Sequence, residues 1–224
     1  MSDLSKVKLI IFDLDGTLVD AYPAIVSSFN FAMRAFGLPP QKDIVIRRAV
    51  GWGDKNLIKP FAGGRPVNRV LAAYRRHHED ALKKKTKFLP GARALLKDLR
   101  RRKYFLAVAS NRPTKYSHII LESLKVKGYF DYILCADKVR RGKPDPELLL
   151  KILRELSVDS SEALYIGDMT IDVIAGRKAR IKTVAVITGS SLKKELSNQR
   201  PFRVIRNLLQ LTSILNHNKG RKHE

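Results

Sequence analysis

Short apolar runs alternate with amphipathic helical patterns along most of the chain. The apolar runs lie at residues 7–14 (VKLIIFDL), 104–110 (YFLAVAS), 132–136 (YILCA), 163–168 (ALYIGD) and 183–188 (TVAVIT). Near-continuous runs of this length are typical of strands buried on both faces. Apolar positions at helical spacing fill residues 24–37, 91–102, 114–125, 145–157 and 171–180. The alternation predicts an α/β fold, a doubly wound parallel sheet, with a last short strand near residues 202–205.

One segment interrupts this alternation. Residues 39–88 contain helical patterns and loops but no strand pattern, and the clearest helix covers residues 69–85. We therefore expect a helical cap, residues 20–89, inserted after the first strand of a Rossmann-like core. The core would comprise residues 1–19 and 90–215, and a flexible basic tail would occupy residues 216–224.

Polar and acidic residues follow the predicted strands where the strands end. Asp13 and Asp15 follow the first strand, at a spacing that points both side chains the same way. The other groups are Ser110-Asn111, Gly142-Lys143-Pro144, Gly167-Asp168 and Asp172. Because ligands of open α/β sheets bind at the carboxyl ends of the strands, we expect these groups to share one site. An oxygen-rich set of this kind suits Mg²⁺, which would offset the cost of burying the acids.

Four short motifs occur in a fixed order along the chain. They are DLDGTLVD (residues 13–20), ASNR (109–112), GKPDPE (142–147) and GDMTIDVIAGRKA (167–179). In this order they resemble the four motifs of the haloacid dehalogenase (HAD) superfamily. The helical segment between the first two resembles the cap of the phosphoglycolate phosphatase-like branch, and FLPGARALLKDL (88–99) resembles that branch's return to the core.

The resemblance implies roles for the acidic residues. Asp13 would be the nucleophile that forms an aspartyl-phosphate, and Asp15 would be the general acid and base. The Mg²⁺ ligands would be Asp13, the backbone carbonyl of Asp15, Asp168 and Asp172. Asp15 favours phosphoester hydrolysis over dehalogenation, because an alkoxide leaving group needs a proton and a halide does not.

The resemblance also implies residues that bind the phosphoryl group. Ser110 and the amide of Asn111 would hydrogen-bond phosphoryl oxygens, and Lys143 would neutralise their charge. Trp52 lies between two glycines in a cap loop, and we interpret it as a substrate contact. The alternative interpretation is that Trp52 packs between cap and core.

The function implied is a Mg²⁺-dependent phosphatase for a small phosphorylated metabolite, with phosphoglycolate as the first candidate. Inorganic pyrophosphatase, nucleotidase and phosphomutase activities on the same core stay open, because the core motifs do not identify the leaving group. A nucleic-acid-binding protein on a hydrolase scaffold is a further alternative, suggested by the net charge of +23. It is less favoured, because the basic residues are dispersed and lack interleaved aromatic residues.

Composition adds little to this picture. The 224 residues contain no apolar run of about 18 residues, so no membrane span is expected. The beginning of the sequence lacks the features of a secretory signal, and Cys135 is the single cysteine, so we expect a cytoplasmic protein. The sequence does not indicate an oligomeric state.

Two positions depart from the pattern of the resembled family. Met169 occupies a place where Ser or Thr is common, and Arg112 occupies one where Lys is frequent. We expect neither residue to contact the chemical groups, so the departures bear on substrate preference alone.

Four cap residues have ambiguous roles in the sequence. His77 and His78 are adjacent on the predicted helix and point apart, so we expect a solvated face and not a metal pair. Arg47 and Arg48 could meet an acidic substrate or face water.

Overall fold

A six-stranded parallel sheet forms the centre of the computed structural model, which describes residues 4–216. The strands are β1 (Leu9–Phe12), β4 (Phe105–Ser110), β5 (Tyr132–Cys135), β6 (Ala163–Gly167), β7 (Lys182–Val186) and β8 (Arg203–Ile205). They lie in the order β5-β4-β1-β6-β7-β8, and all neighbouring strands are parallel. The predicted α/β fold is confirmed, including the short last strand.

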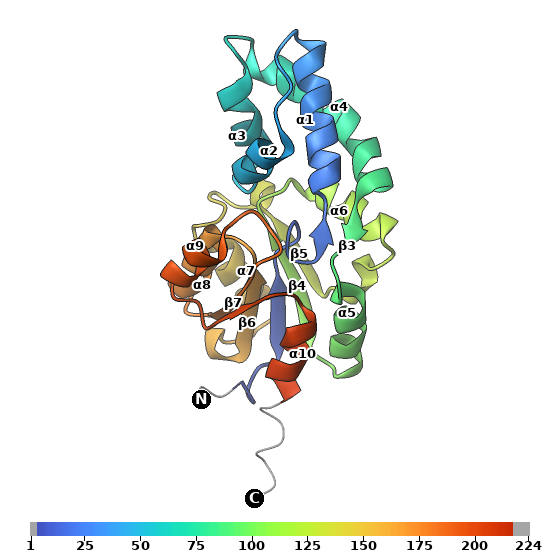
Figure 1. The fold of residues 1–224 in the computed structure, drawn as a ribbon. Coiled ribbons are helices and arrows are strands. Elements are labelled where there is room, and N and C mark those ends of the chain that lie inside the picture. Colours follow the sequence, from blue (N-terminus) through green and yellow to red (C-terminus); the bar gives the residue numbers. More distant parts are fainter. Residues whose placement is uncertain (1–3, 217–224) are drawn as a thin grey trace, which may run out of the picture.

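Helices cover both faces of this sheet (Figure 1). Helices α5 (Ala92–Arg101), α6 (Thr114–Ser123) and α10 (Leu209–Asn216) pack on one face, and α7 (Glu147–Glu155) and α8 (Thr170–Lys178) pack on the other. Helix α9 (Lys193–Asn198) lies against α8. Short 3₁₀ helices cover Lys59–Phe61, Lys127–Tyr129, Ala136–Lys138 and Ser160–Glu162.

Strand β1 shows why the sheet requires this double cover. All four of its residues are fully buried, and alternate side chains point to opposite faces. Ile10 and Phe12 join the apolar cluster that includes α5 and α6, whereas Leu9 and Ile11 join the cluster that includes α7 and α8. The backbone N–H of Asp13 then donates to the carbonyl of Ile166 at 2.8 Å, which fixes Asp13 at the carboxyl edge.

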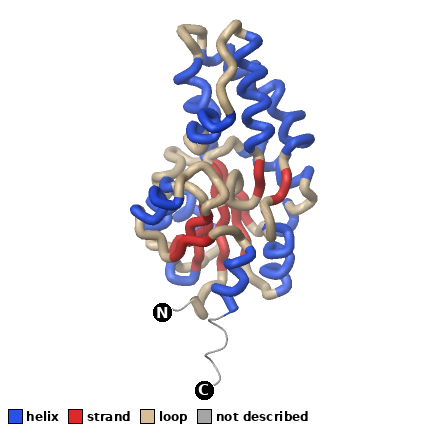
Figure 2. The backbone as a smooth tube through the Cα atoms, viewed as in Figure 1, coloured by secondary structure: helices blue, strands red, loops and turns tan. Residues whose placement is uncertain are grey.

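A helical insertion, which we define as α1 to α4, leaves the sheet after β1 and stands above its carboxyl edge (Figures 1 and 2). The helices are α1 (Tyr22–Ala35), α2 (Asp43–Ala49), α3 (Asp54–Ile58) and α4 (Val67–Lys85). Two short antiparallel strands, β2 (Val19–Asp20) and β3 (Lys87–Phe88), form its base. The expectation of no strand in residues 39–88 was wrong, because a two-residue strand is too short to show alternation. The boundaries of the predicted cap stay a prediction.

The insertion has its own apolar interior between α1 and α4. The buried residues of α4 are Val70, Leu71, Ala73, Tyr74, His78, Ala81 and Leu82, which form one stripe at helical spacing. Phe29 and Met33 of α1 are fully buried in the same apolar cluster. Helix α4 therefore turns one face inward and leaves its basic residues on the other.

Arg48 connects the insertion to the core. Its guanidinium donates to the Glu195 carboxylate at 2.6 Å and to the Ser190 carbonyl at 2.7 Å. The guanidinium of Arg47 lies 4.5 Å from the centre of the Tyr22 ring. Both arginines, whose roles were ambiguous in the sequence, thus have partners within the protein.

None of the helices within residues 4–216 combines the length and the apolar composition that a membrane span requires. The predicted tail falls, from residue 217 onward, outside the described residues.

The two faces of β1 make a direct test of this packing. Ile10→Ala and Ile11→Ala each remove a fully buried side chain from a different cluster, so each should lower the free energy of unfolding by about 2–5 kcal/mol. Leu192→Ala is the control, because Leu192 is 61% exposed, and it should change stability by less than about 0.5 kcal/mol. Urea unfolding measures all three, and equal losses in the three variants would contradict the assignment of β1 to the core.

Candidate active site

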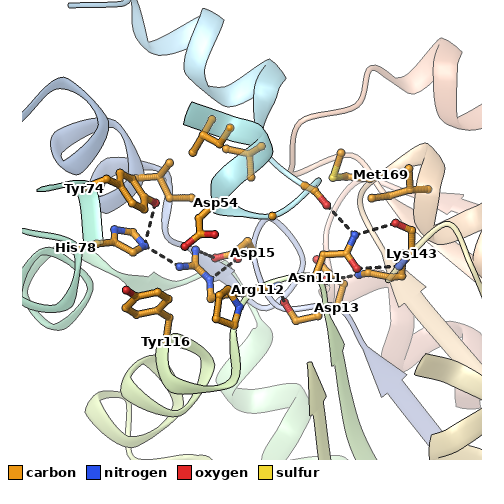
Figure 3. Close-up of a pocket in the computed structure, with 18 residues that line it drawn as sticks. Asp13, Asp15, Asp54, Tyr74, His78, Asn111, Arg112, Tyr116, Lys143 and Met169 are labelled. Atoms are coloured by element: carbon orange, nitrogen blue, oxygen red, sulfur yellow. Dashed lines mark hydrogen bonds and ion pairs between the residues drawn. The ribbon is translucent and has the colours of Figure 1, made fainter. Parts of the chain in front are cut away.

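The carboxyl edge of β1 and β4 opens into a pocket that the helical insertion covers (Figure 3). The cavity has a volume of about 60 Å³. Five of the predicted site residues line it, namely Asp13, Asp15, Ser110, Asn111 and Lys143. The structure thus brings together groups that are up to 130 residues apart in the chain.

Asp13 and Lys143 form a buried ion pair in this pocket. Lys143 Nζ lies 2.5 Å from Oδ1 of Asp13 and 2.7 Å from Oδ1 of Asp172. It also donates to the carbonyl of Ala109 at 3.0 Å and to the hydroxyl of Tyr165 at 3.1 Å. Among the described residues, no donor contacts Oδ2 of Asp13. That oxygen is therefore available to a ligand.

Asp13 belongs to a cluster of three buried carboxylates. Asp13, Asp168 and Asp172 each offer one oxygen, and the three oxygens lie within 4.8 Å of one another. The one positive charge of Lys143 faces three negative charges, so the cluster lacks counter-charge. Because buried charges without partners are costly, this set of oxygen donors fits a divalent cation such as Mg²⁺.

Burial and the neighbouring charges shift the pKa values of Asp13, Asp168 and Lys143. Burial raises the pKa of Asp13 to about 7, an effect that Lys143 opposes and Asp172 reinforces. Burial, and then the charges of Asp13 and Asp172, raise the pKa of Asp168 well above its ordinary value. Burial opposes protonation of Lys143, yet the two neighbouring carboxylates raise its pKa above the usual range. Lys143 is thus a fixed cation, and the acids retain a need for further positive charge.

Backbone and hydroxyl groups hold Asp168 in place. Its Oδ1 accepts from the Thr17 hydroxyl at 2.9 Å, and its Oδ2 accepts from the Ser190 N–H at 3.1 Å. Two glycines approach the same carboxylate, since a Cβ on Gly16 or Gly189 would lie 2.7 or 1.6 Å from Oδ2. Gly16 also has a φ of +79°, which favours glycine. The glycine of the first motif therefore makes room for Asp168.

Asp172 uses most of its hydrogen-bonding capacity within the protein. Its Oδ1 accepts from the Tyr165 hydroxyl at 2.7 Å, and its Oδ2 accepts from the Met169 N–H at 2.9 Å. The Met169 side chain lines the pocket. The expectation that Met169 would not contact the chemical groups was therefore wrong, since its backbone holds one of them.

Ser110 is the last residue of β4, and Asn111 follows it at the edge of the pocket. The Ser110 hydroxyl accepts from the Arg112 N–H at 3.2 Å. The Asn111 side chain accepts from the Lys143 N–H at 2.8 Å and donates to the carbonyls of Lys143 and Gly51, at 2.9 and 2.8 Å. The side chain of Asn111 thus joins two core loops to the helical insertion.

Asp15 meets a partner that the sequence analysis missed. Nε and Nη2 of Arg112 donate to the two carboxylate oxygens of Asp15, each at 2.8 Å (Figure 3). The side chains of Arg112 and Asp15 are 8% and 13% exposed, so the pair is largely shielded from water. The expectation that Arg112 would not contact the chemical groups was wrong. No local pattern could reveal this pair, because its members are 97 residues apart.

His78 also lies in the pocket, contrary to the expectation of a solvated face. It is fully buried, and its Nε2 lies 2.7 Å from Nη1 of Arg112. The sequence contained a signal for this position, because His78 falls on the apolar stripe of α4, four residues after Tyr74. His77 is partly exposed and stacks on Phe31.

The structure does not bring Trp52 to the pocket. Its neighbours Gly51 and Gly53 line the cavity, whereas the indole is 50% exposed. The role of Trp52 as a substrate contact therefore stays a prediction.

Comparisons with known proteins identify a family for the chain. Residues 10–186 match the family model described as haloacid dehalogenase-like hydrolase. A phosphoglycolate phosphatase of Pseudomonas fluorescens is 31% identical over 213 residues, covering 91% of this chain and 78% of the relative. An N-acetylmuramic acid 6-phosphate phosphatase of Pseudomonas putida is 28% identical over 190 residues, covering 82% of this chain and 84% of the relative.

A solved structure supports the fold. The crystal structure of a "predicted phosphoglycolate phosphatase" from Haemophilus somnus has a TM-score of 0.88 and 22% identity, and covers 94% of this chain and 98% of its own. The match to the family model begins within β1 and extends to the end of β7, so it contains every residue of the carboxylate cluster. The chain belongs to the haloacid dehalogenase-like hydrolase family.

Proposed function

We propose that the protein is a Mg²⁺-dependent phosphatase that hydrolyses a small phosphomonoester through an aspartyl-phosphate on Asp13. The family and its phosphatase relatives support phosphatase activity. The observation that carries the mechanism is the Asp13 carboxylate, which lines the pocket with Oδ2 open and Oδ1 held by Lys143. A carboxylate fixed by one oxygen can present the other as a nucleophile.

The reaction would proceed in two displacements at phosphorus. In the first, Oδ2 of Asp13 attacks phosphorus, the bond to the leaving oxygen breaks, and Asp15 gives that oxygen a proton. In the second, Asp15 takes a proton from water, the water oxygen attacks phosphorus, and the bond to Asp13 breaks. Ser110 would hydrogen-bond the phosphoryl oxygens, with the Asn111 amide beside it, and Lys143 would offset their charge.

The carboxylate cluster would hold the cation. Asp13, Asp168 and Asp172 fit it through their three neighbouring oxygens, and the backbone carbonyl of Asp15 is a further proposed ligand. When bound, Mg²⁺ supplies positive charge that reduces repulsion between the phosphoryl group and the carboxylates. Asp172 contacts three donors, Lys143, Tyr165 and Met169, whereas Asp168 accepts from two, so Asp172 would be the candidate for holding the cation through water.

Phosphoglycolate is the first candidate for the substrate. The similarity to a relative named as a phosphoglycolate phosphatase, at 31% identity, supports this choice. The relative that acts on N-acetylmuramic acid 6-phosphate shows that similar proteins differ in leaving group.

Replacement of the nucleophile tests the mechanism. Asp13→Asn keeps the size of the side chain but removes the attacking oxygen, so kcat should fall at least about 10³-fold. The assay is phosphate release from a panel of phosphomonoesters and pyrophosphate, with Mg²⁺ or with a chelator. Asp80→Asn, at an exposed position of α4, is the control and should keep the wild-type rate. Turnover by Asp13→Asn at more than a tenth of the wild-type rate would refute the role of Asp13.

Stability in the presence of the cation tests the metal site separately. At a Mg²⁺ concentration about 100 times its Kd, mass action should raise Tm by about 5–10 °C. The rise should be smaller at pH 5 than at pH 8, because a proton competes with the cation at Asp13, whose pKa is raised to about 7. The same raised pKa means that, without Mg²⁺, the contribution of Asp13 to stability decreases as pH rises toward 7.

Differential scanning fluorimetry with Mg²⁺ or with a chelator measures these shifts. Asp168→Asn should lose most of the Mg²⁺-induced rise in Tm, whereas Asp80→Asn should keep it. A rise of the same size in wild type and in Asp168→Asn would show that the cation binds elsewhere.

A further inference from the structure

Arg112 is a buried cation at the end of the pocket covered by the helical insertion (Figure 3). Arginine has five N–H donors, and the bonds to Asp15 and His78 use three of them. The two others have no partner among the described residues. Apart from Lys143, which is bound to Asp13, Arg112 is the one permanent cation among the lining residues.

Little else in the lining is positively charged. Its larger uncharged side chains include Ile25, Leu57, Tyr74 and Tyr116. Asp54 also lines the pocket, but its carboxylate is 2.7 Å from Arg75 and so has its own counter-charge. Ion pairs are stronger beside apolar walls than in water. Any negative charge on a leaving group would therefore find its partner at Arg112.

The insertion holds Arg112 through a neutral histidine. Burial, reinforced by the charge of Arg112, lowers the pKa of His78 to about 2. Arg112 is a donor only, so Nε2 of His78 must accept and Nδ1 must carry the hydrogen. Nδ1 then donates to the Ser28 hydroxyl at 3.1 Å, which donates to the Ala24 carbonyl at 2.8 Å. This chain fixes the guanidinium from α1 and α4.

We propose that Arg112 is the specificity-determining residue of the pocket and binds a carboxylate on the leaving group, with His78 as its positioning residue. The inference rests on the proposed phosphatase function and narrows its substrate class to small phosphomonoesters whose leaving group carries a carboxylate.

The competing explanation is that Arg112 only holds Asp15 in place. A pair of phosphonates separates the two explanations without any turnover. The first, 3-phosphonopropionate, has the shape of phosphoglycolate with a methylene in place of the ester oxygen, and propylphosphonate lacks its carboxylate. With Mg²⁺ present, calorimetry should show that wild type binds the first about 10–100 times more tightly.

Three variants complete the binding experiment. In Arg112→Gln the ratio of the two dissociation constants should fall to near 1, and in Arg112→Lys it should be intermediate, because Lys keeps the charge but loses the planar fork. Arg100→Gln removes an exposed arginine paired with Asp131 and should keep the wild-type ratio. A wild-type ratio near 1, or an unchanged ratio in Arg112→Gln, would overturn the proposal.

The test of His78 uses the same ratio. His78→Phe removes the acceptor for Arg112 and should reduce the ratio, whereas His78→Gln retains an acceptor oxygen and should restore part of it. A merely structural role would lower Tm and leave the ratio unchanged in the protein that remains folded.

Hydrolysis then distinguishes failure of this inference from failure of the proposed function. Wild type should have a kcat/KM for phosphoglycolate at least about 10 times that for the analogue in which a neutral carboxamide replaces the carboxylate. Equal values for the two compounds would overturn the role of Arg112 and leave the phosphatase intact. Turnover of neither compound, nor of any other phosphomonoester, together with discrimination between the phosphonates, would refute the phosphatase proposal and leave Arg112 as an anion site.

Discussion

The rest of this structure depends on three buried carboxylates whose oxygens lie within 4.8 Å of one another. Asp13, Asp168 and Asp172 face one buried lysine in the described part of the chain. Such a cluster survives only where neighbouring groups hold each oxygen and where a cation can enter. Two glycines leave room for the Asp168 carboxylate, and the hydroxyl of Tyr165 donates a hydrogen bond to Asp172. The sheet supplies the rigid edge on which these groups meet.

The pocket has two ends with different origins. At one end Asp13, Lys143 and Ser110 come from the ends of strands or from the loops after them. At the other end Arg112 comes from the sheet edge, but His78 comes from α4 of the insertion. Chemistry at phosphorus can therefore stay constant while the insertion adjusts what surrounds the leaving group. Arg112 lies at the border, because it contacts both Asp15 and His78.

The sheet and the acidic residues could be predicted because both follow from local pattern and one rule of topology. Apolar runs gave the strands, and parallel strands place their carboxyl ends at one edge. The burial of His78 follows from the apolar stripe of α4 on which it lies, whereas its adjacency to His77 bears only on metal pairing. The pair of Arg112 and Asp15 had no local signal, because it depends on how two distant loops meet. Strand β3 could not be predicted, because two residues are too few to show an alternating pattern.

The pairing of β2 with β3 has a consequence for the history of such a chain. The polypeptide leaves the sheet through β2 and returns through β3, and these two strands are hydrogen-bonded neighbours. Because the two ends of the insertion are adjacent, its size does not affect the spacing of the strands in the core. Its length and sequence can therefore change without altering the register of the sheet. The antiparallel pair of β2 and β3 is thus a constant attachment point. One helical insertion can be exchanged for another there, while the residues of the hydrolytic site in the core are inherited unchanged.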